Sequence, residues 1–437
     1  MIVDCDVVVV GAGVAGLECA RTLNAHGLAV RVVEASDGVG GRVRSDRVDG
    51  FTVDRGFQLL NPAYPAVRAR VDVRALDLRP LLPGVAVRRD EGLALLADPR
   101  RAPRLLGPTL RSGYVRPREL VALARWAAPA LGPARRLLHG PDETLARSLD
   151  RAGVDGAIRR EVLAPFLAGV LAEGDGTTSA AFARLLVRMF LLGTPGVPAG
   201  GMAELPAQLA RDLPDVVLGT RVVAVERTGG ESGPATVRVR TDGRSAGGNG
   251  AADGTIDARA VVVATDAVTA EALVGVRAPT MKGLVTHWYA TDEAPRADAA
   301  IVVDGRRQGG RRPGPVVNAA VMSNAAPSYA PAGLHLVQVT CLLDAGPAAE
   351  PPAEPDVRRQ AGEMFGVSTS TWREIARHLV PGALPAQPAP LVARQEVDLG
   401  GGVFVCGDHR DTASLQGALV SGARTADEVR RQLSGGS

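Results

Sequence analysis

A glycine-rich turn between a β-branched strand and a helix constrains the fold of this chain more than any other feature. The run Asp6–Val10 is followed directly by the turn Gly11-Ala-Gly13-Val-Ala-Gly16, and helix-forming residues continue over Leu17–Ala25. Gly11 permits the tight turn, Gly13 lets the backbone approach a pyrophosphate, and Gly16 allows close packing of the helix on the strand. The pattern predicts a dinucleotide-binding βαβ unit.

The second strand of this unit ends in an acid. Ala29–Val33 is a β-branched strand, and Glu34 with Ala35 follows it. The distance of Glu34 from the glycine turn is close to the roughly 20 residues at which a carboxylate accepts the adenosine ribose hydroxyls. Val14 and Ala15 place N–H groups at the amino end of the helix, where a diphosphate binds. A glycine-rich loop without a ligand is the alternative, but the complete strand, helix and acid favour a dinucleotide.

A second glycine pair, Gly40–Gly41, and Arg42 come soon after the acid. The glycines let the backbone reach a second stretch of the cofactor, and Arg42 can meet phosphate; a plain surface turn is the alternative. An acid followed by Gly-Gly-Arg resembles the flavoprotein superfamily of amine oxidases, protoporphyrinogen oxidases and phytoene desaturases. The resemblance implies FAD. Cys406 does not fall where some amine oxidases carry a covalent flavin thiol, so we expect the FAD to be non-covalent.

The same resemblance implies further cofactor residues along the chain. In the family a later segment brings a backbone valine against the adenine, which would be Val222 or Val223 here, and the strand after it ends at Ala264 and Thr265. Near the carboxy terminus, Gly407 and Asp408 would meet the ribityl diphosphate. The remaining residues that the resemblance assigns lie in the segment before residue 60 and at the last helix: Gly56, Phe57, Gln58, Ser414, Gln416, Gly417 and Ala418.

We therefore expect an α/β fold with a Rossmann-like FAD-binding domain assembled from the discontinuous segments 1–60, 198–265 and 397–437. The intervening segments, 61–197 and 266–396, should form an α+β substrate domain with a mixed sheet and helices.

Two segments have the composition of surface elements. Residues 100–136 are rich in arginine and leucine and are cut by prolines into short helices. This pattern fits either peripheral contact with a membrane or solvated helix faces, and we favour the solvated faces. Residues 242–254 are glycine-rich and predict a dispensable hairpin loop.

Lys282 is the single lysine among the 50 basic residues. A lysine in a chain that otherwise uses arginine suggests a compact amine that can lose its proton. The strand that follows is similar to one that, in amine oxidases, carries a lysine holding water near flavin N5. The resemblance thus implies a catalytic role for Lys282, with an incidental surface lysine as the alternative. No cysteine or histidine spacing predicts a metal site.

The substrate is less specified than the cofactor. Amine oxidases commonly have an aromatic ring where Ser414 stands, and only 3% of this chain is aromatic. The leading hypothesis is an oxidoreductase that takes hydride from a CH–CH or CH–N bond of an apolar small molecule, with oxygen or a quinone as electron acceptor. An amine oxidase, a non-redox flavoprotein such as a polyene isomerase, and a non-catalytic flavin-binding protein stay open.

Composition excludes other classes. The net charge of +3 is too small to indicate nucleic acid binding, and a mean hydropathy of +0.07 with 22% charged residues is ordinary for a globular protein. No apolar segment approaches the ~20 residues needed to span a bilayer. The four cysteines show no CxxC spacing, so we expect a cytoplasmic protein. The oligomeric state stays open.

Overall fold

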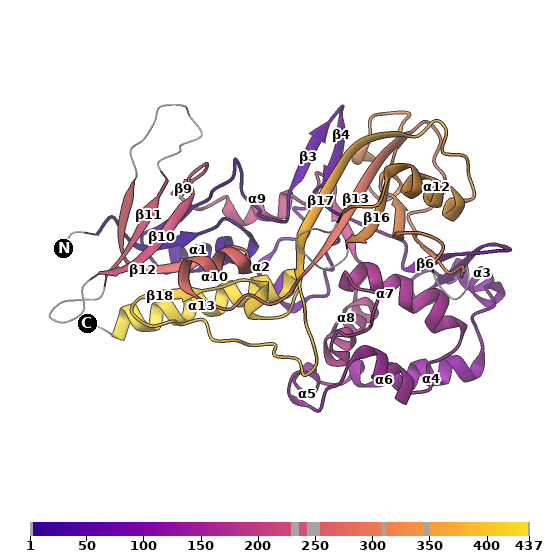
Figure 1. Cartoon of the computed structure of the whole chain (residues 1–437), viewed down its shortest axis with the longest axis horizontal. Coiled ribbons are helices and arrows are strands. Elements are labelled where there is room, and N and C mark those ends of the chain that lie inside the picture. The colour runs from indigo at the N-terminus through magenta and orange to yellow at the C-terminus, as the bar shows by residue number, and fades with distance from the viewer. Residues whose placement is uncertain (1–2, 229–235, 243–253, 308–311, 344–349, 436–437) are drawn as a thin grey trace.

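A computed structural model of the chain describes residues 3–228, 236–242, 254–307, 312–343 and 350–435. Two mixed sheets lie side by side, and a cluster of helices packs below the second sheet (Figure 1).

The first sheet is centred on β1 (Cys5–Val10), which pairs in parallel with β2 (Val30–Val33) and with β12 (Thr255–Val263). The strand order is β10-β11-β12-β1-β2-β9, and β18 pairs with β12. The other strands of this sheet are β9 (Val216–Val217), β10 (Val222–Thr228), β11 (Thr236–Thr241) and β18 (Val403–Val405). Because β1, β2, β12 and β18 run parallel, their carboxyl ends meet at one edge, where such sheets bind ligands.

Two long helices, α1 (Val14–Ala25) and α13 (Leu415–Gly435), pack against each other on this sheet. Their contact is close, since a Cβ on Gly422 would lie 2.2 Å from the carbonyl oxygen of Ala15. The shorter helix α9 (Glu204–Ala210) packs on the same face, whereas α10 (Ala267–Val274) packs on the opposite face, against Val263 and Val405. The predicted α/β fold with a Rossmann-like unit is confirmed.

The second sheet has the order β17-β13-β16-β15-β14-β6-β7, in which only β14 and β6 run parallel. Its strands are β6 (Gly84–Arg89), β7 (Gly92–Ala97), β13 (Met281–Thr291), β14 (Ile301–Asp304), β15 (Val316–Val321), β16 (His335–Leu343) and β17 (Arg373–Pro385). Side chains alternate between its faces. The odd-numbered residues of β13 and β16 pack under α12 (Glu354–Phe365), and the even-numbered ones lie on the opposite face.

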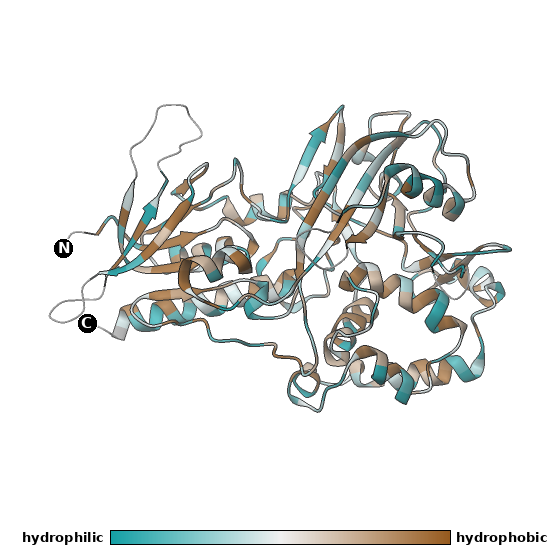
Figure 2. Ribbon diagram, in the orientation of Figure 1, coloured by the Kyte–Doolittle hydropathy of each residue, from teal (hydrophilic) through white to brown (hydrophobic). Residues whose placement is uncertain are grey.

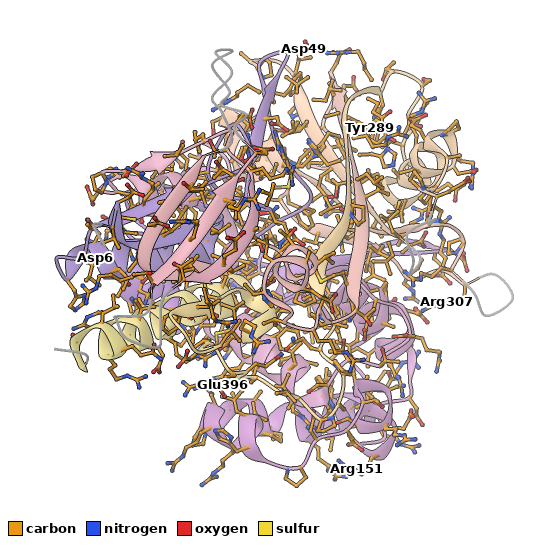
Figure 3. All side chains as sticks on the ribbon, turned by 60° about the vertical axis from the view of Figure 1, so that its left-hand side comes forward. Asp6, Asp49, Arg151, Tyr289, Arg307 and Glu396 are labelled. Carbon is orange, nitrogen blue, oxygen red and sulfur yellow. The ribbon has the colours of Figure 1, made fainter. Side chains whose placement is uncertain are left out.

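The helical cluster comes from one continuous stretch of chain. It consists of α3 (Leu106–Arg111), α4 (Pro117–Ala127), α5 (Ala134–His139), α6 (Leu145–Arg151), a π-helical turn (Ile158–Leu163), α7 (Ala164–Leu171) and α8 (Ala180–Leu192). Figure 2 shows α7 and α8 mostly in brown, and α7 packs against β14, β15 and β16. Arg151 lies at the outer end of this cluster (Figure 3).

Small elements join these parts. They are the hairpins β3 (Ser45–Val48) with β4 (Phe51–Asp54) and β5 (Leu78–Pro80) with β8 (Gly196–Pro198), and the helices α2 (Pro65–Arg70) and α11 (Met322–Ala325). Asp49 lies at the tip of the first hairpin (Figure 3).

Two differences from the sequence predictions concern secondary structure. The first helix begins at Val14 rather than Leu17, because Gly13 already serves as its N-cap. The long strand β17 was not predicted, since its sequence is interrupted by Pro381 and Gly382. Of the predicted loop 242–254, residues 243–253 lie outside the described residues. The strands of the two sheets fall within the segments expected for the two domains, whose exact boundaries stay a prediction.

Candidate functional site

A cavity of about 580 Å³ lies where the carboxyl edge of the first sheet meets the second sheet and the helices α7 and α8. Most of the residues predicted to bind the cofactor line it. These are Gly11, Gly13, Val14, Ala15, Glu34, Ala35, Gly40, Gly41, Arg42, Gly56, Phe57, Gln58, Val222, Ala264, Thr265, Gly407, Asp408, Ser414 and Ala418.

The glycine turn forms one end of the cavity. Gly11 has a φ of +105°, which favours glycine, and a Cβ on Gly16 would lie 2.1 Å from the Gly11 carbonyl oxygen. A Cβ on Gly13 would meet no protein atom within 4 Å, so this position opens into the cavity. No side chain caps the amino end of α1 at this point. Free N–H groups and a positive helix dipole there suit a diphosphate.

Glu34 lines the cavity beside this turn. Its Oε2 accepts a hydrogen bond from the Ala12 N–H at 2.7 Å, and its Oε1 accepts one from the Ser36 N–H at 2.8 Å. Each oxygen retains further acceptor capacity. The carboxylate is therefore fixed by the backbone and can still accept ribose hydroxyls.

Arg42 connects three segments that are far apart in the sequence. Its guanidinium donates to Asp408 Oδ1 at 2.6 Å and to the carbonyl oxygen of Ala383, in β17, at 2.8 Å. Gln58 Nε2 donates to the Arg42 carbonyl oxygen at 2.6 Å. The motif Gly-Gly-Arg thus joins the edge of the first sheet to the second sheet.

Four of the predicted cofactor residues do not line the cavity. Gly16 instead packs the helix on the strand. Val223 is 49% exposed, so of the two valines it is Val222 that lies at the cavity. Gln416 Oε1 accepts from the Ala66 N–H, and Gly417 packs against the backbone of Thr412.

Lys282 does not lie at the cavity, where the resemblance placed a catalytic lysine. It is absent from the cavity lining, and its ammonium forms an ion pair with Glu173. It also donates to Thr178 Oγ1 at 2.9 Å and to the Leu171 carbonyl oxygen at 3.3 Å. The side chains of Lys282 and Glu173 are only 14% and 7% exposed. The amine therefore holds the end of α7 against β13, and on that strand it is Leu284 that faces the cavity.

The other half of the lining was not predicted from the sequence. It comes from α7 and α8 and from the second sheet: Phe166, Gly169, Val170, Leu186, Met189, Phe190, Leu284, Ile301, Asn318, Val380 and Leu384. The lining residues of α7 and those of α8 are each spaced i, i+3, i+4, a pattern in the sequence that indicates one face of a helix. The same spacing is typical of core residues, so it does not by itself mark a cavity.

Polar groups are few in this second half. Asn61 is hydrogen-bonded at both ends of its amide, since its Nδ2 donates to the Met189 carbonyl oxygen at 3.0 Å and its Oδ1 accepts from the Ala63 N–H at 2.9 Å. Burial raises the pKa of Tyr64 to about 12, so its hydroxyl stays protonated at neutral pH. Among the described lining residues, carboxylates are limited to Glu34, Asp266 and Asp408, all on the first-sheet side.

His409, which follows Gly407 and Asp408 in the sequence, is buried and is absent from the cavity lining. Burial lowers its pKa to about 4, with smaller effects from neighbouring charges, so its ring is neutral near pH 7. Across the described part of the chain, histidines, cysteines and acids nowhere gather into a group able to hold a metal ion. Nor does any helix there have the length and apolar character to cross a membrane.

Comparison with known proteins agrees with this geometry. The family model for flavin containing amine oxidoreductases matches residues 14–430. The chain belongs to this family. The resemblance drawn from Gly40-Gly41-Arg42 is therefore confirmed.

Individual members of the family differ in what their names say they act on. The chain is 31% identical over 251 residues to putrescine oxidase from Kocuria rosea, a match covering 52% of this chain and 50% of that protein. It is 38% identical over 112 residues to hydroxyneurosporene desaturase from Rubrivivax gelatinosus, covering 23% and 21%. The chain thus matches about half of the first relative's length and a fifth of the second's.

Solved structures share the fold over nearly the whole chain. An oxidoreductase from Methanosarcina mazei superposes with a TM-score of 0.69 at 16% identity, covering 97% of this chain and all of that one. At this identity the likeness shows the fold alone.

Proposed function

We propose that this protein is an FAD-dependent oxidoreductase that takes hydride from a neutral, apolar small molecule. Membership of a flavin-containing family supports the flavin, and the second half of the cavity supports the substrate class. The observation that carries the proposal is the apolar wall of α7, α8 and β13, which lacks a carboxylate among its described residues.

The residues of the first half fit FAD. The open side of Gly13 and the uncapped amino end of α1 would hold the diphosphate, with the Arg42–Asp408 pair beside it. Glu34 would accept the adenosine ribose hydroxyls. Ser414 and Ala418, at the start of α13, would meet the pyrimidine edge of the flavin, where the helix dipole favours negative charge.

Non-covalent attachment is part of this proposal. All four cysteines are buried and unpaired, and the described lining of the cavity contains neither cysteine nor histidine. Either residue would have to reach the flavin to form a covalent link. Unpaired cysteines also fit the cytoplasm that we propose as the location.

The bound cofactor supplies the hydride acceptor, so the protein needs to supply orientation and exclusion of water. Leu284 and Ile301 from the second sheet and Phe166 from α7 present apolar surface to the reacting molecule. An ammonium group would find no counter-charge on these walls. A CH–CH bond of a neutral substrate therefore suits the site better than the CH–N bond of a protonated amine, and oxygen or a quinone would reoxidise the flavin.

The similarity to putrescine oxidase favours amine oxidation as the second candidate. To separate the two, the purified protein is denatured to identify the released flavin and then mixed anaerobically with neutral polyenes and with alkylamines. Bleaching of the flavin colour by the neutral compounds alone supports our proposal. Bleaching by amines alone overturns the substrate class, and a substrate converted to an isomer of equal mass indicates a non-redox flavoprotein. A protein that binds no FAD overturns the whole proposal.

The segment 100–136 adds a proposal about partners. It contains five exposed large apolar side chains: Leu106, Leu110, Leu120, Val121 and Leu131. Its single acid, Glu119, is turned inward, where Oε2 accepts from the Ile158 N–H. Exposed leucines among arginines favour peripheral contact with an anionic membrane over solvated faces. Flotation with vesicles of anionic and of neutral lipid tests this, because failure to float with either refutes the contact.

A further inference from the structure

A row of four buried polar side chains crosses the face of the second sheet that is turned toward the cavity. Thr286 Oγ1 and Thr340 Oγ1 lie 3.0 Å apart, and Thr340 Oγ1 donates to Gln338 Oε1 at 3.0 Å. Gln338 Nε2 donates in turn to Asn318 Oδ1 at 3.1 Å. None of the four is more than 5% exposed. The row begins at the Phe57 N–H, which donates to Thr286 Oγ1 at 3.2 Å.

The direction of every hydrogen bond in this row follows from its members. The hydroxyl proton of Thr340 is used on Gln338, so the proton between the two threonines belongs to Thr286. If the amides of Gln338 and Asn318 were both turned by about 180°, the donor and the acceptor of each side-chain hydrogen bond in the row would be exchanged. Thr286 would then accept from Phe57 and from Thr340, and its own buried proton would lack an acceptor among these contacts. An unsatisfied buried donor is costly, so the row fixes which end of the Asn318 amide is the nitrogen.

That nitrogen lies at the cavity. Asn318 and Gly169 both line the cavity, and a Cβ on Gly169 would come within 2.1 Å of Asn318 Nδ2. Oδ1 accepts from Gln338 Nε2, whereas no hydrogen bond from Nδ2 is found among the described residues. Two N–H donors are therefore presented through a gap that glycine leaves in an apolar wall.

We propose that Asn318 determines specificity by donating a hydrogen bond from Nδ2 to an oxygen acceptor of the substrate. The substrate class becomes an apolar molecule that carries a carbonyl, hydroxyl or carboxylate oxygen away from the bond that is oxidised. An ammonium group offers donors only and cannot take this place. The inference rests on the proposed function and narrows it.

The experiment uses the flavin-loaded protein and three probes on one ring: cyclohexanone, methylcyclohexane and cyclohexylamine. Calorimetry measures binding whether or not a probe is oxidised, so failure of the proposed redox reaction does not obscure the result. In the wild type the ratio of cyclohexanone affinity to methylcyclohexane affinity should be about tenfold higher than in a variant without the donor, which is the difference that one hydrogen bond provides. Cyclohexylamine should bind more weakly than the ketone.

Asn318→Leu should lower the ratio of cyclohexanone affinity to methylcyclohexane affinity about tenfold. Asn318→Asp, which replaces the two donors by acceptors, should shift the preference toward cyclohexylamine. Asn324→Ser is the control, because Asn324 is absent from the cavity lining and both N–H groups of its amide donate, to the carbonyl oxygens of Arg296 and Asp298. This variant should leave the ratio unchanged. An Asn318→Leu protein that keeps the wild-type ratio overturns the proposal, and so do equal effects of the Asn324 and Asn318 variants.

Discussion

Asp54 is a fully buried carboxyl whose ionisation should set the pH dependence of stability. Burial raises its pKa from 3.8 to about 6, against the opposing effect of hydrogen bonds from Ser45 Oγ, the Met202 N–H and the Tyr329 hydroxyl. The native state therefore holds this proton up to about pH 6, whereas the unfolded state loses it near pH 4. The stabilisation is complete below pH 4 and is lost as the pH rises to about 6.

The shift of roughly two pKa units corresponds to about 3 kcal/mol. Asp54→Asn removes the titration and keeps the shape, because the amide oxygen can accept from Ser45 and Met202 and the amide nitrogen can donate to Tyr329. We expect the free energy of unfolding of the variant, relative to the wild type, to rise by about 3 kcal/mol between pH 4 and pH 7.

Urea denaturation of both proteins at several pH values measures this difference in the free energy of unfolding. The contributions of the other titrating groups are the same in both proteins and cancel in the difference. Ser45→Ala is a second arm, since loss of a hydrogen bond to the carboxylate should move the midpoint of the pH dependence upward. Parallel stability curves for wild type and Asp54→Asn would refute the reasoning, because they would mean that Asp54 does not titrate differently in the native state.

Three further predictions concern the site and its surroundings. Gly13→Val should abolish flavin binding with little change in the melting temperature of the apoprotein. Gly16→Val should prevent folding, because its Cβ would lie 2.1 Å from the Gly11 carbonyl oxygen. Flavin content and thermal melting of both variants test this, and a Gly13→Val protein that retains flavin would contradict it. Lys282→Met should lower the free energy of unfolding by about 3–5 kcal/mol, because it leaves the buried Glu173 carboxylate without its cation, and adding Glu173→Gln should restore part of this loss. The variant should leave the rate of flavin reoxidation by oxygen unchanged. A slower rate in stopped-flow measurements would support the catalytic role of Lys282. Replacing the loop 242–254 by a short turn should change the free energy of unfolding by only about 0.6 kcal/mol per twofold change in loop length. The reason is that the flanking strands are already hydrogen-bonded where the loop leaves them. A large drop in melting temperature or flavin content would contradict this prediction.

The first half of the cavity was predictable because its signals are local. The glycines of the first turn and Glu34 act through backbone conformation and strand ends, which a short stretch of sequence specifies. The sequence did not specify which of two neighbouring residues faces the cavity when their side chains point to opposite faces of a strand. Val222 lies at the cavity while the adjacent Val223 is 49% exposed, and the valine pair alone does not say which faces inward.

The second half was not predictable because it depends on pairing between distant segments. β17 contributes Val380 and Leu384 to the lining, yet its proline and glycine favour a turn until the neighbouring strand β13 supplies hydrogen bonds. Lys282 illustrates the same limit. Its rarity in the chain was a real signal, but the partner that explains it, Glu173, lies across the fold at the end of α7.

Arg42 shows how one side chain depends on both kinds of signal. Its place after Gly40 and Gly41 is local and was predictable from the sequence, whereas its partners are not. One guanidinium donates to Asp408, at the edge of the first sheet, and to the carbonyl oxygen of Ala383, in β17 of the second sheet. Ala383 is followed by Leu384, which lines the cavity and pairs with Lys282 in the ladder of β13 and β17. The contact between the two halves of the cavity therefore depends on a strand that only long-range pairing creates.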